Sequence, residues 1–401
     1  METSTLEVAD VIRELTDASG NVSGLRLTYA QKRVLRDILA CRTPQLGLHH
    51  VEKCDHCTHK IKTYNSCRNR NCPKCGGEQR AKWLKERSKD LLHVPYFHGV
   101  FTLPAELAQV ALQNQKMVYS ILLRATSDSL KEVAADPRYL GAHIGVVAVL
   151  HTWGQTLLHH PHVHCVIPGG GLALDGSQWV ACADTFFLPV HVLSAAYRDK
   201  FLAYLTAAFR AEELRFTGRL AHLAKKENFD ALCEKWRDKG WVVHVKPPFA
   251  GPEVVLKYLA RYTNRAAIAN SRLVSFEQGK ASFRYKDYAR GNEQRIMSLD
   301  GAEFLRRFLL HVLPAGFMQI RHYGLLANRC RNKKLALCRD LLAGSGIKIG
   351  QEHMSADTGE DTDTDRHRCP VCGVGTMRIV LHQTRRYSTG TRPGPVVLDS
   401  S

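Results

Sequence analysis

The stretch HHPHVHCVIPGGG, residues 159 to 171, carries four histidines within six positions before it continues into an apolar strand and a run of glycines. Alternate residues of a strand share a face, so His162 and His164 are expected to point to the same side. The residues on the other face are expected to enter the core: Val163, Cys165 and Ile167. Two neighbouring imidazoles can bind one divalent ion, although an isolated H-x-H pair is more often a surface or hydrogen-bonded pair. The metal hypothesis therefore needs support from elsewhere in the chain.

The segments on either side of a short loop, GVVAVLHT (145–152) and HPHVHCVI (160–167), are predicted to form an antiparallel hairpin. Such a hairpin would bring further polar residues close to the two histidines. A third metal ligand is expected from this neighbourhood, and His151 and Gln155 are the two candidates.

The rest of the chain mixes short strands with separate helices. Helices are expected at 28–42, 105–135, 192–214 and 227–239, and another begins at Pro252. Strands are expected at 94–103, 241–246, 271–276, 281–287 and 294–298. Hairpins with segregated helices are typical of an α+β fold, so we predict an antiparallel sheet flanked by helices.

The segment KYLARYTNR, on the helix expected after Pro252, carries two tyrosines. Tyr258 and Tyr262 are four residues apart and therefore share one helical face. Aromatic residues at this spacing usually pack a core, but here Lys257, Arg261 and Arg265 are interleaved with them. A phenol is a poor nucleophile at its ordinary pKa of about 10. Beside arginines and a metal-bound phosphate it can lose its proton and attack phosphorus, so both tyrosines are candidate nucleophiles.

Charge and composition narrow the class of protein. The 401 residues are 44 % hydrophobic, enough for a folded protein of two or three domains. The formal net charge of +18 favours a polyanionic partner, first of all nucleic acid, over a merely basic enzyme. We find neither a membrane-spanning stretch nor a secretory leader in the sequence, so we expect no membrane partner and a cytoplasmic location.

Two cysteine pairs, Cys54–Cys57 and Cys72–Cys75, have the CxxC spacing of zinc knuckles. The fourteen residues between the pairs predict that all four cysteines converge on one tetrahedral zinc, with Cys67 as a nearby substitute. Four protein ligands leave no position open for water, so the zinc is expected to be structural. Free cysteines are the alternative.

Basic residues lie around and after these cysteines. Those around the cysteines are Lys60, Lys62, Arg68, Arg70 and Lys74, and the helix that follows adds Arg80, Lys82 and Lys85. Such a helix can present either an ordinary solvated face or a phosphate-binding one. Its position directly after the cysteines favours DNA binding. Further along, QIRHYG forms a basic and aromatic cluster around Arg321, suited either to stacking on single-stranded bases or to a buried strand end.

A third CxxC pair, Cys369–Cys372, follows the acidic segment QEHMSADTGEDTDTDR (351–366). That segment has too few apolar residues to bury a core and is expected to be a linker. A single CxxC provides half of a zinc site, and its partners could be His367, His382, Cys330, Cys338 or another subunit. A reducible or incidental pair is the alternative.

The combination of H-V-H with a Y-x-x-x-Y helix resembles the two-tyrosine class of HUH endonucleases. Five motifs in order make the resemblance more specific: YNSCRNRNCPKC (64–75), VFTLPAEL (100–107), HTWGQTLLHHPHVHCVIPGGG (151–171), YLARYTNRAAI (258–268) and FMQIRHYGLLANR (317–329). Together, over residues 25–345, they resemble bacterial rolling-circle transposases of the insertion sequence ninety-one family. One departure is Asn71, where family members often have histidine before the CPKC knuckle.

The resemblance implies a small zinc-ribbon-like domain ahead of an HUH-type catalytic domain, with Mg²⁺ or Mn²⁺ at the histidine pair. It also implies single-strand cleavage of DNA at transposon ends, a 5′-phosphotyrosine intermediate and no nucleotide cofactor. We accordingly expect four parts: 1–92 with the zinc module and basic helix, a catalytic domain at 93–345, a linker at 346–368, and a short CxxC module with a disordered tail at 369–401.

Three alternatives to a transposase remain open at this stage. A rolling-circle replication initiator or relaxase would use the same residues on another DNA substrate. A metallohydrolase would use the histidines without the tyrosines. A non-catalytic, zinc-dependent DNA-binding protein would need neither.

Overall fold

The computed structural model describes residues 6–17, 21–183, 187–249, 266–344 and 368–382. The chain divides into two compact units. The larger unit contains residues 1–39 and 68–351, and the smaller contains 40–67 and 352–401.

A five-stranded sheet forms the centre of the larger unit, with the order β13-β5-β6-β3-β9. Its strands are β3 (Tyr96–Thr102), β5 (Gly145–Trp153), β6 (His159–Pro168), β9 (Val243–Phe249) and β13 (Ile320–Gly324). Every neighbouring pair in this sheet is antiparallel. The predicted hairpin of 145–152 and 160–167 is confirmed as β5 and β6.

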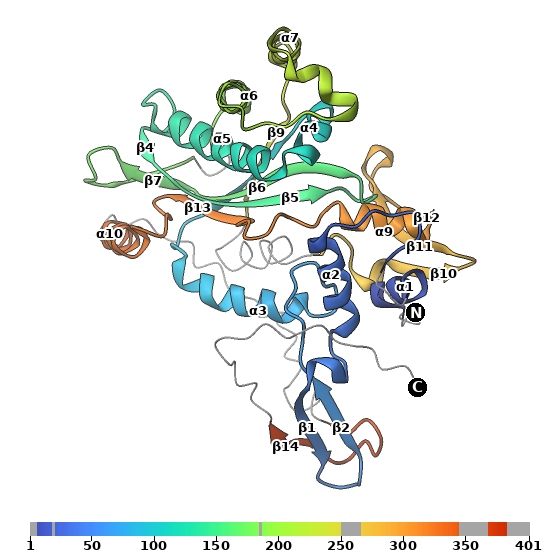
Figure 1. Ribbon diagram of the computed structural model, residues 1–401. Coiled ribbons are helices and arrows are strands. Elements are labelled where there is room, and N and C mark those ends of the chain that lie inside the picture. Colours follow the sequence, from blue (N-terminus) through green and yellow to red (C-terminus); the bar gives the residue numbers. More distant parts are fainter. Residues whose placement is uncertain (1–5, 18–20, 184–186, 250–265, 345–367, 383–401) are drawn as a thin grey trace. The chain divides into compact units, whose positions relative to one another are not determined.

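Helices cover one face of this sheet, as Figure 1 shows for α5 (Gln115–Ala135) and α6 (Val190–Arg210). The alternate strand residues Val163, Cys165 and Ile167 enter the core beneath them, as the sequence pattern predicts. The same core includes residues of α4 (Ala108–Gln113) and α7 (Lys226–Arg237). Helix-facing and opposite-facing side chains alternate along β6 because its residues follow the period of two of a strand.

The opposite face of the sheet has a second, smaller core, which includes Val149 and Val166. Residues of α10 (Arg331–Gly344) pack into this core. A small sheet of β4 (Ala142–His143), β7 (Gly170–Ala173) and β8 (Trp179–Ala181) continues from the end of β6. The glycine run makes this continuation possible, because Gly170 has φ +150° and a Cβ there would lie 2.5 Å from the Val180 carbonyl oxygen.

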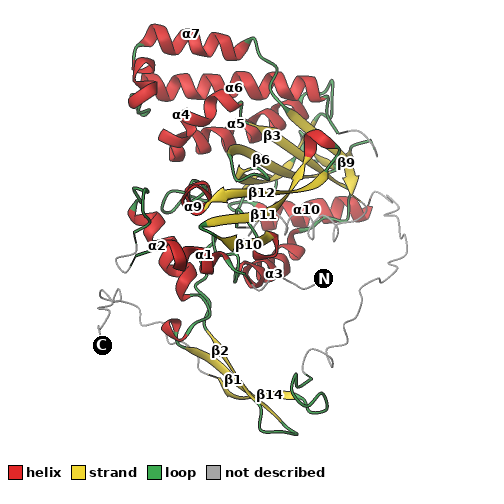
Figure 2. Cartoon of the chain, turned by 90° about the vertical axis from the view of Figure 1, so that its right-hand side faces the viewer, coloured by secondary structure: helices red, strands yellow, loops and turns green. Residues whose placement is uncertain are grey.

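The larger unit also has a meander of β10 (Leu273–Glu277), β11 (Lys280–Asp287) and β12 (Glu293–Asp300), with α9 (Gly301–Leu309) after it (Figure 2). The remaining helices in the described part of the chain are α1 (Val8–Leu15), α2 (Tyr29–Ala40) and α3 (Gly76–Arg87). Short 3₁₀ turns lie at Pro44–Leu46, Ser88–Asp90, Ala105–Leu107, Gly218–Ala224, Asn270–Arg272 and Tyr288–Arg290. Helices with antiparallel sheets confirm the predicted α+β class.

The smaller unit contains a three-stranded sheet with the order β14-β1-β2. Its strands are β1 (Leu48–Cys54), β2 (Lys60–Tyr64) and β14 (Met377–His382). Because β14 pairs with β1, with Met377 opposite Cys54, the C-terminal CxxC segment is not the separate module that we predicted from the sequence. Across the described residues, no helix combines the length and the apolar character that a membrane span requires.

Candidate active site and metal centres

Three histidines meet on the sheet face opposite α5 and α6. His151 on β5 lies directly across the ladder from His162 on β6, and His164 follows two residues later on the same face. One side-chain nitrogen from each lies within 4.8 Å of the other two. His151 and His164 are buried, with 3 % and 7 % of their surfaces exposed, whereas His162 is only partly buried. The antiparallel register of β5 and β6 thus assembles a three-nitrogen group.

The imidazoles of His162 and His164 are oriented for chelation. Their Nε2 atoms lie 3.1 Å apart. The Nδ1 of His162 is 2.7 Å from the carbonyl oxygen of His160, which can only accept, so Nδ1 carries the hydrogen and Nε2 keeps its lone pair. Two adjacent ligands of an octahedral ion with bonds of about 2.1 Å would be about 3.0 Å apart. The observed spacing therefore fits one small divalent ion.

His98 on β3 supports His164 from the side. Its Nε2 lies 2.9 Å from Nδ1 of His164, and the two rings stack with centroids 5.1 Å apart. When His164 donates its Nδ1 hydrogen to His98, its Nε2 is left available to a metal. On the other side of the group, the Trp153 ring stacks on His151 at 4.7 Å. These contacts fix the ring planes before any ion binds.

Burial favours the neutral form of His98, His162 and His164 by lowering the pKa of each. Loss of solvation lowers the pKa of His162 to about 4, and it lowers that of His98 to about 4 with a smaller contribution from the Lys246 charge. The pKa of His164 is held well below its ordinary value, chiefly by burial. Neutral imidazoles have a lone pair to share, so the site is ready for metal binding without prior deprotonation.

Gln155, the other candidate for the third ligand, lies elsewhere. Its Nε2 donates to the hydroxyl of Tyr288 at 3.3 Å, and its Oε1 accepts from the backbone N–H of Lys286. The geometry therefore favours His151.

Sequence reasoning missed two residues beside the histidine group. His98 is a single histidine in an apolar strand, and the sequence carries no signal for its pairing beside His164. Lys246 on β9 pairs with His98 across the ladder, and its exposed ammonium belongs to the same face of the sheet. A cation at this point is suited to a phosphate.

The two candidate nucleophiles, Tyr258 and Tyr262, lie outside the described residues, together with Arg261 and Arg265. The described residues stop at Phe249 on β9, next to β3, and begin again at Ala266. The role of the two tyrosines as nucleophiles therefore stays a prediction.

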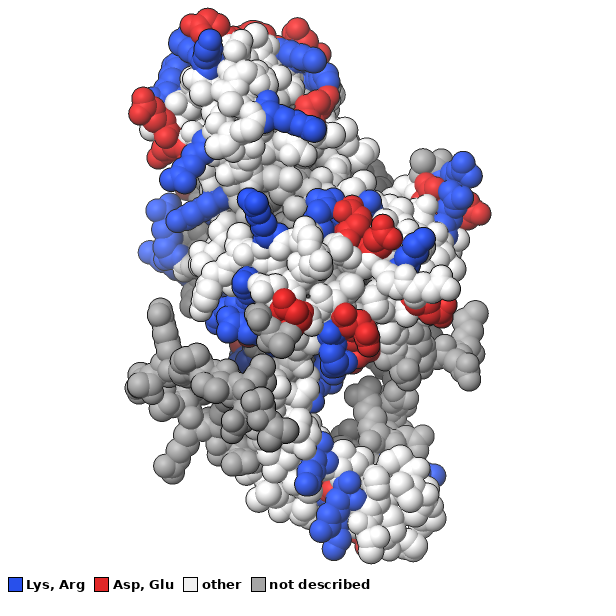
Figure 3. Space-filling model, turned by 45° about the vertical axis from the view of Figure 1, so that its right-hand side comes forward, with Lys and Arg blue, Asp and Glu red and all other residues white. Residues whose placement is uncertain are grey.

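The predicted DNA-binding cations differ in their surroundings. Lys82 and Lys85 are exposed on α3, whose backbone also includes Arg80. Lys74 is paired with Glu7 at 2.7 Å, and Arg70 donates to the Phe317 carbonyl at 3.1 Å. Arg68 is exposed. Figure 3 shows Lys and Arg side chains interspersed with acidic groups on the face in view rather than gathered in a single patch.

The QIRHYG cluster is divided between the two faces of the sheet. Arg321 donates to the Ser120 hydroxyl at 3.1 Å and lies over the Phe317 ring, on the side covered by α5. His322 pairs with Val147 and lies on the histidine side. Of the two interpretations that the sequence leaves open for QIRHYG, these contacts favour a partly buried strand end over a stacking surface.

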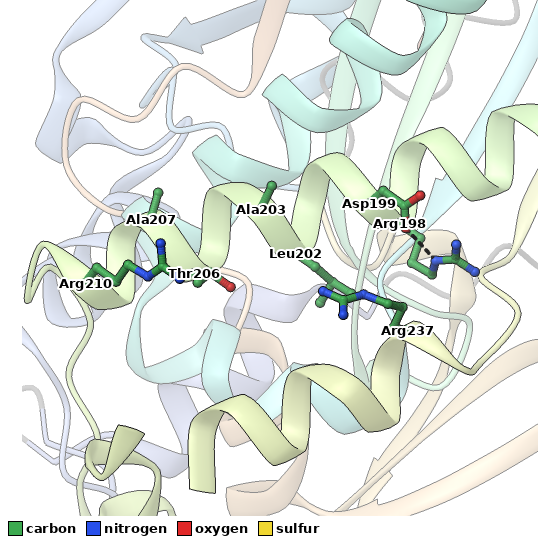
Figure 4. Close-up of a pocket in the computed structure, with 8 residues that line it drawn as sticks. All are labelled: Arg198, Asp199, Leu202, Ala203, Thr206, Ala207, Arg210 and Arg237. Atoms are coloured by element: carbon green, nitrogen blue, oxygen red, sulfur yellow. Dashed lines mark hydrogen bonds and ion pairs between the residues drawn. The ribbon is translucent and has the colours of Figure 1, made fainter. Parts of the chain in front are cut away.

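A groove between α6 and α7 lies on the helical side of the molecule (Figure 4). Three arginines line it, and two of them have acidic partners, Arg198 with Asp199 and Arg237 with Glu234. Because α6 covers the sheet face opposite the histidine group, this groove is separate from the candidate active site.

The single zinc site predicted from four cysteines is wrong. Cys54 and Cys57 lie with Cys369 and Cys372, with one sulfur from each within 4.8 Å of the others. Cys72 and Cys75 are not part of this group. The pairing of β14 with β1 is the physical reason, because it brings the C-terminal CxxC to the first knuckle. All thirteen cysteines lie in the described residues, and none of them is joined in a disulfide.

Comparisons with known proteins agree with this architecture. Residues 145–334 match a family model described as "Putative transposase", and residues 12–103 match one described as "Transposase zinc-binding domain". The chain is 50 % identical over 382 residues to "Putative transposase y4qJ" of Sinorhizobium fredii, covering 94 % of this chain and 95 % of that protein. It is 30 % identical over 345 residues to "Transposase for insertion sequence element IS801" of Pseudomonas savastanoi pv. phaseolicola, covering 84 % and 80 %. No solved structure matches.

Proposed function

This chain belongs to the insertion sequence ninety-one family of transposases, and from that premise we propose that it cuts and rejoins single-stranded DNA at transposon ends through a 5′-phosphotyrosine intermediate. Members of such a family act on DNA, and an N-terminal zinc-binding domain accompanies the transposase domain.

One observation carries the proposal: the Nε2 atoms of His162 and His164 face each other at 3.1 Å, with a nitrogen of His151 completing the group. Imidazoles bind an ion as neutral donors, and the group contains no carboxylate among the residues that the structure describes, so the donor set is uncharged. An ion bound there would keep its full positive charge for an anionic ligand such as a phosphodiester. Nitrogen donors favour Mn²⁺ over the harder Mg²⁺, although either ion fits the spacing.

The histidines would hold Mg²⁺ or Mn²⁺ against the scissile phosphate, and the ion would supply Lewis-acid activation of the phosphoryl group. His98 and the His160 carbonyl fix the directions of the two Nε2 lone pairs. The exposed Lys246 ammonium, next to His98 on β9, would contact a phosphate oxygen and hold the strand across this face.

Tyr258 and Tyr262 are the proposed nucleophiles. The phenolate oxygen of one tyrosine attacks phosphorus in line, a tyrosyl O–P bond forms, and the bond from phosphorus to the 3′-oxygen breaks. The departing 3′-oxygen takes up a proton and becomes a free hydroxyl. Attack by another 3′-hydroxyl on the phosphotyrosine reverses these steps and joins two strands. Bond energy is conserved throughout, so no nucleotide cofactor is required.

DNA binding outside the active site is assigned to the zinc-binding region and α3. Lys82 and Lys85 are exposed on α3 and available to phosphates, and Arg80 lies on the same helix. Lys74 is excluded from a leading role because its ammonium is already paired with Glu7. The exposed lysines would add salt-sensitive affinity without reading sequence.

The test uses purified protein, labelled single-stranded oligonucleotides from the ends of the element, and Mg²⁺ or Mn²⁺. A labelled protein band on a denaturing gel is the expected result, and EDTA should abolish it. The Tyr258→Phe/Tyr262→Phe double variant should give no band. His162→Ala should also give none, whereas the matched control His143→Ala, an exposed histidine on β4, should behave as the unaltered protein does.

The same gel separates the rival functions. Nicked DNA without a labelled protein band would replace the proposal with a metallohydrolase, because water would then be the nucleophile. DNA that is bound but never cut would indicate a non-catalytic DNA-binding protein. Cleavage of plasmid origin sequences in preference to the element ends would indicate a replication initiator or relaxase.

A further inference from the structure

The cysteine group of the smaller unit consists of Cys54, Cys57, Cys369 and Cys372. Its sulfur–sulfur distances are those of a tetrahedral metal site. Cys54 Sγ lies 3.7 Å from Cys372 Sγ, and Cys57 Sγ lies 3.7 Å from Cys369 Sγ. Four sulfurs bound to zinc at about 2.3 Å in a tetrahedron would be about 3.8 Å apart. A disulfide would need about 2.05 Å, and all four residues are free thiols. The spacing therefore corresponds to a shared ion.

The loops that carry the sulfurs have the hydrogen bonds of zinc knuckles. The backbone N–H groups of His56 and Cys57 donate to Cys54 Sγ at 3.3 and 3.4 Å. In the C-terminal loop, the N–H of Gly375 donates to Cys372 Sγ at 3.3 Å. Such donors stabilise a thiolate, which is the form of cysteine that binds metal.

A frame of backbone and side-chain contacts fixes the two loops against each other. The N–H of Asp55 donates to the Thr376 carbonyl at 3.1 Å, and the N–H of Thr376 returns a bond to the Asp55 carboxylate at 2.8 Å. Arg378 pairs with the other oxygen of that carboxylate at 3.1 Å. The register of β1 with β14 then continues from Cys54 opposite Met377.

Gly375 is needed where the two loops meet. A Cβ at this position would collide with Cys54 Sγ, and it would also lie 2.6 Å from the Cβ of His56. Only glycine lets the C-terminal loop approach the first knuckle this closely.

Apolar packing around these residues is slight. Among the residues described in this unit, only Cys54, Cys369 and Met377 are buried in this cluster, and Cys57, Ile61 and Cys372 are partly buried. More than half of the surface of Ile379, Val380 and Leu381 is exposed. So little buried surface is insufficient to hold a six-residue strand, and a metal is the usual substitute for a missing core.

We propose that Cys54, Cys57, Cys369 and Cys372 bind one structural zinc that fastens residues 368–382 to the β1–β2 hairpin. The matched zinc-binding domain ends at residue 103 and the matched transposase domain ends at residue 334, so half of this site lies outside both. The zinc closes the chain between two pairs of ligands more than 300 residues apart, as the 318 positions from Cys54 to Cys372 illustrate. This zinc site does not depend on the phosphotyrosine reaction proposed above.

The first test is zinc content by mass spectrometry on the full chain, purified from zinc-supplemented medium. The Cys369→Ser/Cys372→Ser variant should contain one zinc equivalent less than the unaltered chain. The matched control, Cys182→Ser/Cys330→Ser, changes two partly buried cysteines outside all the described groups and should lose none. Equal zinc content in the two double variants would overturn the proposal.

A second variant keeps every ligand in place, which covers the case in which the serine variant does not fold. Gly375→Ala should release one zinc equivalent to a chelator at least tenfold faster than the unaltered chain. Gly240→Ala, where an added Cβ meets nothing within 4 Å, is the control and should release zinc at the unaltered rate. Release from Gly375→Ala at the rate of Gly240→Ala would contradict the site.

Discussion

The histidine group and the cysteine group of the smaller unit are assembled in different ways. His151, His162 and His164 come from two strands that follow each other in the chain, and the register of one hairpin aligns them. Cys54 and Cys57 meet Cys369 and Cys372 only because β14, near the other end of the chain, pairs with β1. The first group lies on a sheet with two extensive cores, and the second has almost none. Packing therefore holds the histidine group in place, and the zinc that we propose would take the place of packing in the cysteine group.

The largest effect is expected when the histidine group loses a ligand. His162→Ala should reduce metal-dependent cleavage of a single-stranded end by about 10³-fold, because activation of the scissile phosphate is lost. Single-turnover cleavage measures the loss. His143→Ala should cleave within twofold of the unaltered protein, and similar losses in both variants would remove the histidine group from the chemistry.

Acid should weaken the larger unit through histidines that are buried in the neutral form. His311, which donates to the Leu157 carbonyl and accepts from Thr152, has its pKa lowered by burial from an ordinary 6.5 to about 3. The unfolded chain then binds more protons between those values, so stability is complete above pH 6.5 and falls as the pH decreases. This residue alone should cost about 2 kcal/mol between pH 7 and pH 5.

Denaturant unfolding at the two pH values measures that cost. His311→Gln, which has no titrating ring, should show a smaller decrease than the unaltered chain by about the same 2 kcal/mol. An equal decrease in both proteins would mean that His311 is protonated in the folded state.

The cysteine group should affect DNA binding more than chemistry. Cys369→Ser/Cys372→Ser is expected to weaken binding of the transposon end by about tenfold, because the zinc-binding region that we propose as a DNA-docking surface then loses its fixed shape. Cleavage at saturating DNA should stay within about threefold, since the histidine group lies in the other unit. Fluorescence anisotropy measures the affinity for DNA, and single-turnover kinetics measure the cleavage rate. A loss of cleavage as large as that of His162→Ala would erase the distinction between the two regions.

The smallest effect is expected at the edge of the histidine group. Lys246→Gln should raise the KM for the oligonucleotide by about three- to tenfold with little change in kcat, because one phosphate contact is removed. Lys116→Gln, an exposed lysine on α5, is the matched control. The same increase in KM for both variants would indicate a general effect of charge rather than a contact at the site.

The arrangement of the histidine group could be predicted from the sequence, because it depends on a local pattern. The period of two in HPHVHCVI places His162 and His164 on one face, and the adjacent hairpin brings in His151, so the metal group follows from about twenty residues of chain. The contribution of His98 could not be predicted, because it depends on which strand lies next to β6.

The prediction of one zinc site from Cys54–Cys57 and Cys72–Cys75 was wrong because the site also depends on strand pairing, here between segments much farther apart in the chain. Spacing made Cys54–Cys57 and Cys72–Cys75 look like one site, since the two pairs are close in the chain. The pairing of β14 with β1 instead brings Cys369 and Cys372 to Cys54 and Cys57. Nothing in the local pattern of Cys369–Cys372 indicates which strand β14 will join. Contacts over such separations depend on the whole fold, which no motif records.

The central claim is that a tyrosine becomes covalently joined to DNA, and peptide mass spectrometry of the trapped adduct tests it most directly. The protein would be incubated with a single-stranded end and Mn²⁺, denatured, and digested with nuclease and protease. We predict one nucleotide-bearing peptide, with the phosphate on Tyr258 or Tyr262. A nucleotide on any other residue, or cleaved DNA with no modified peptide, would contradict the account.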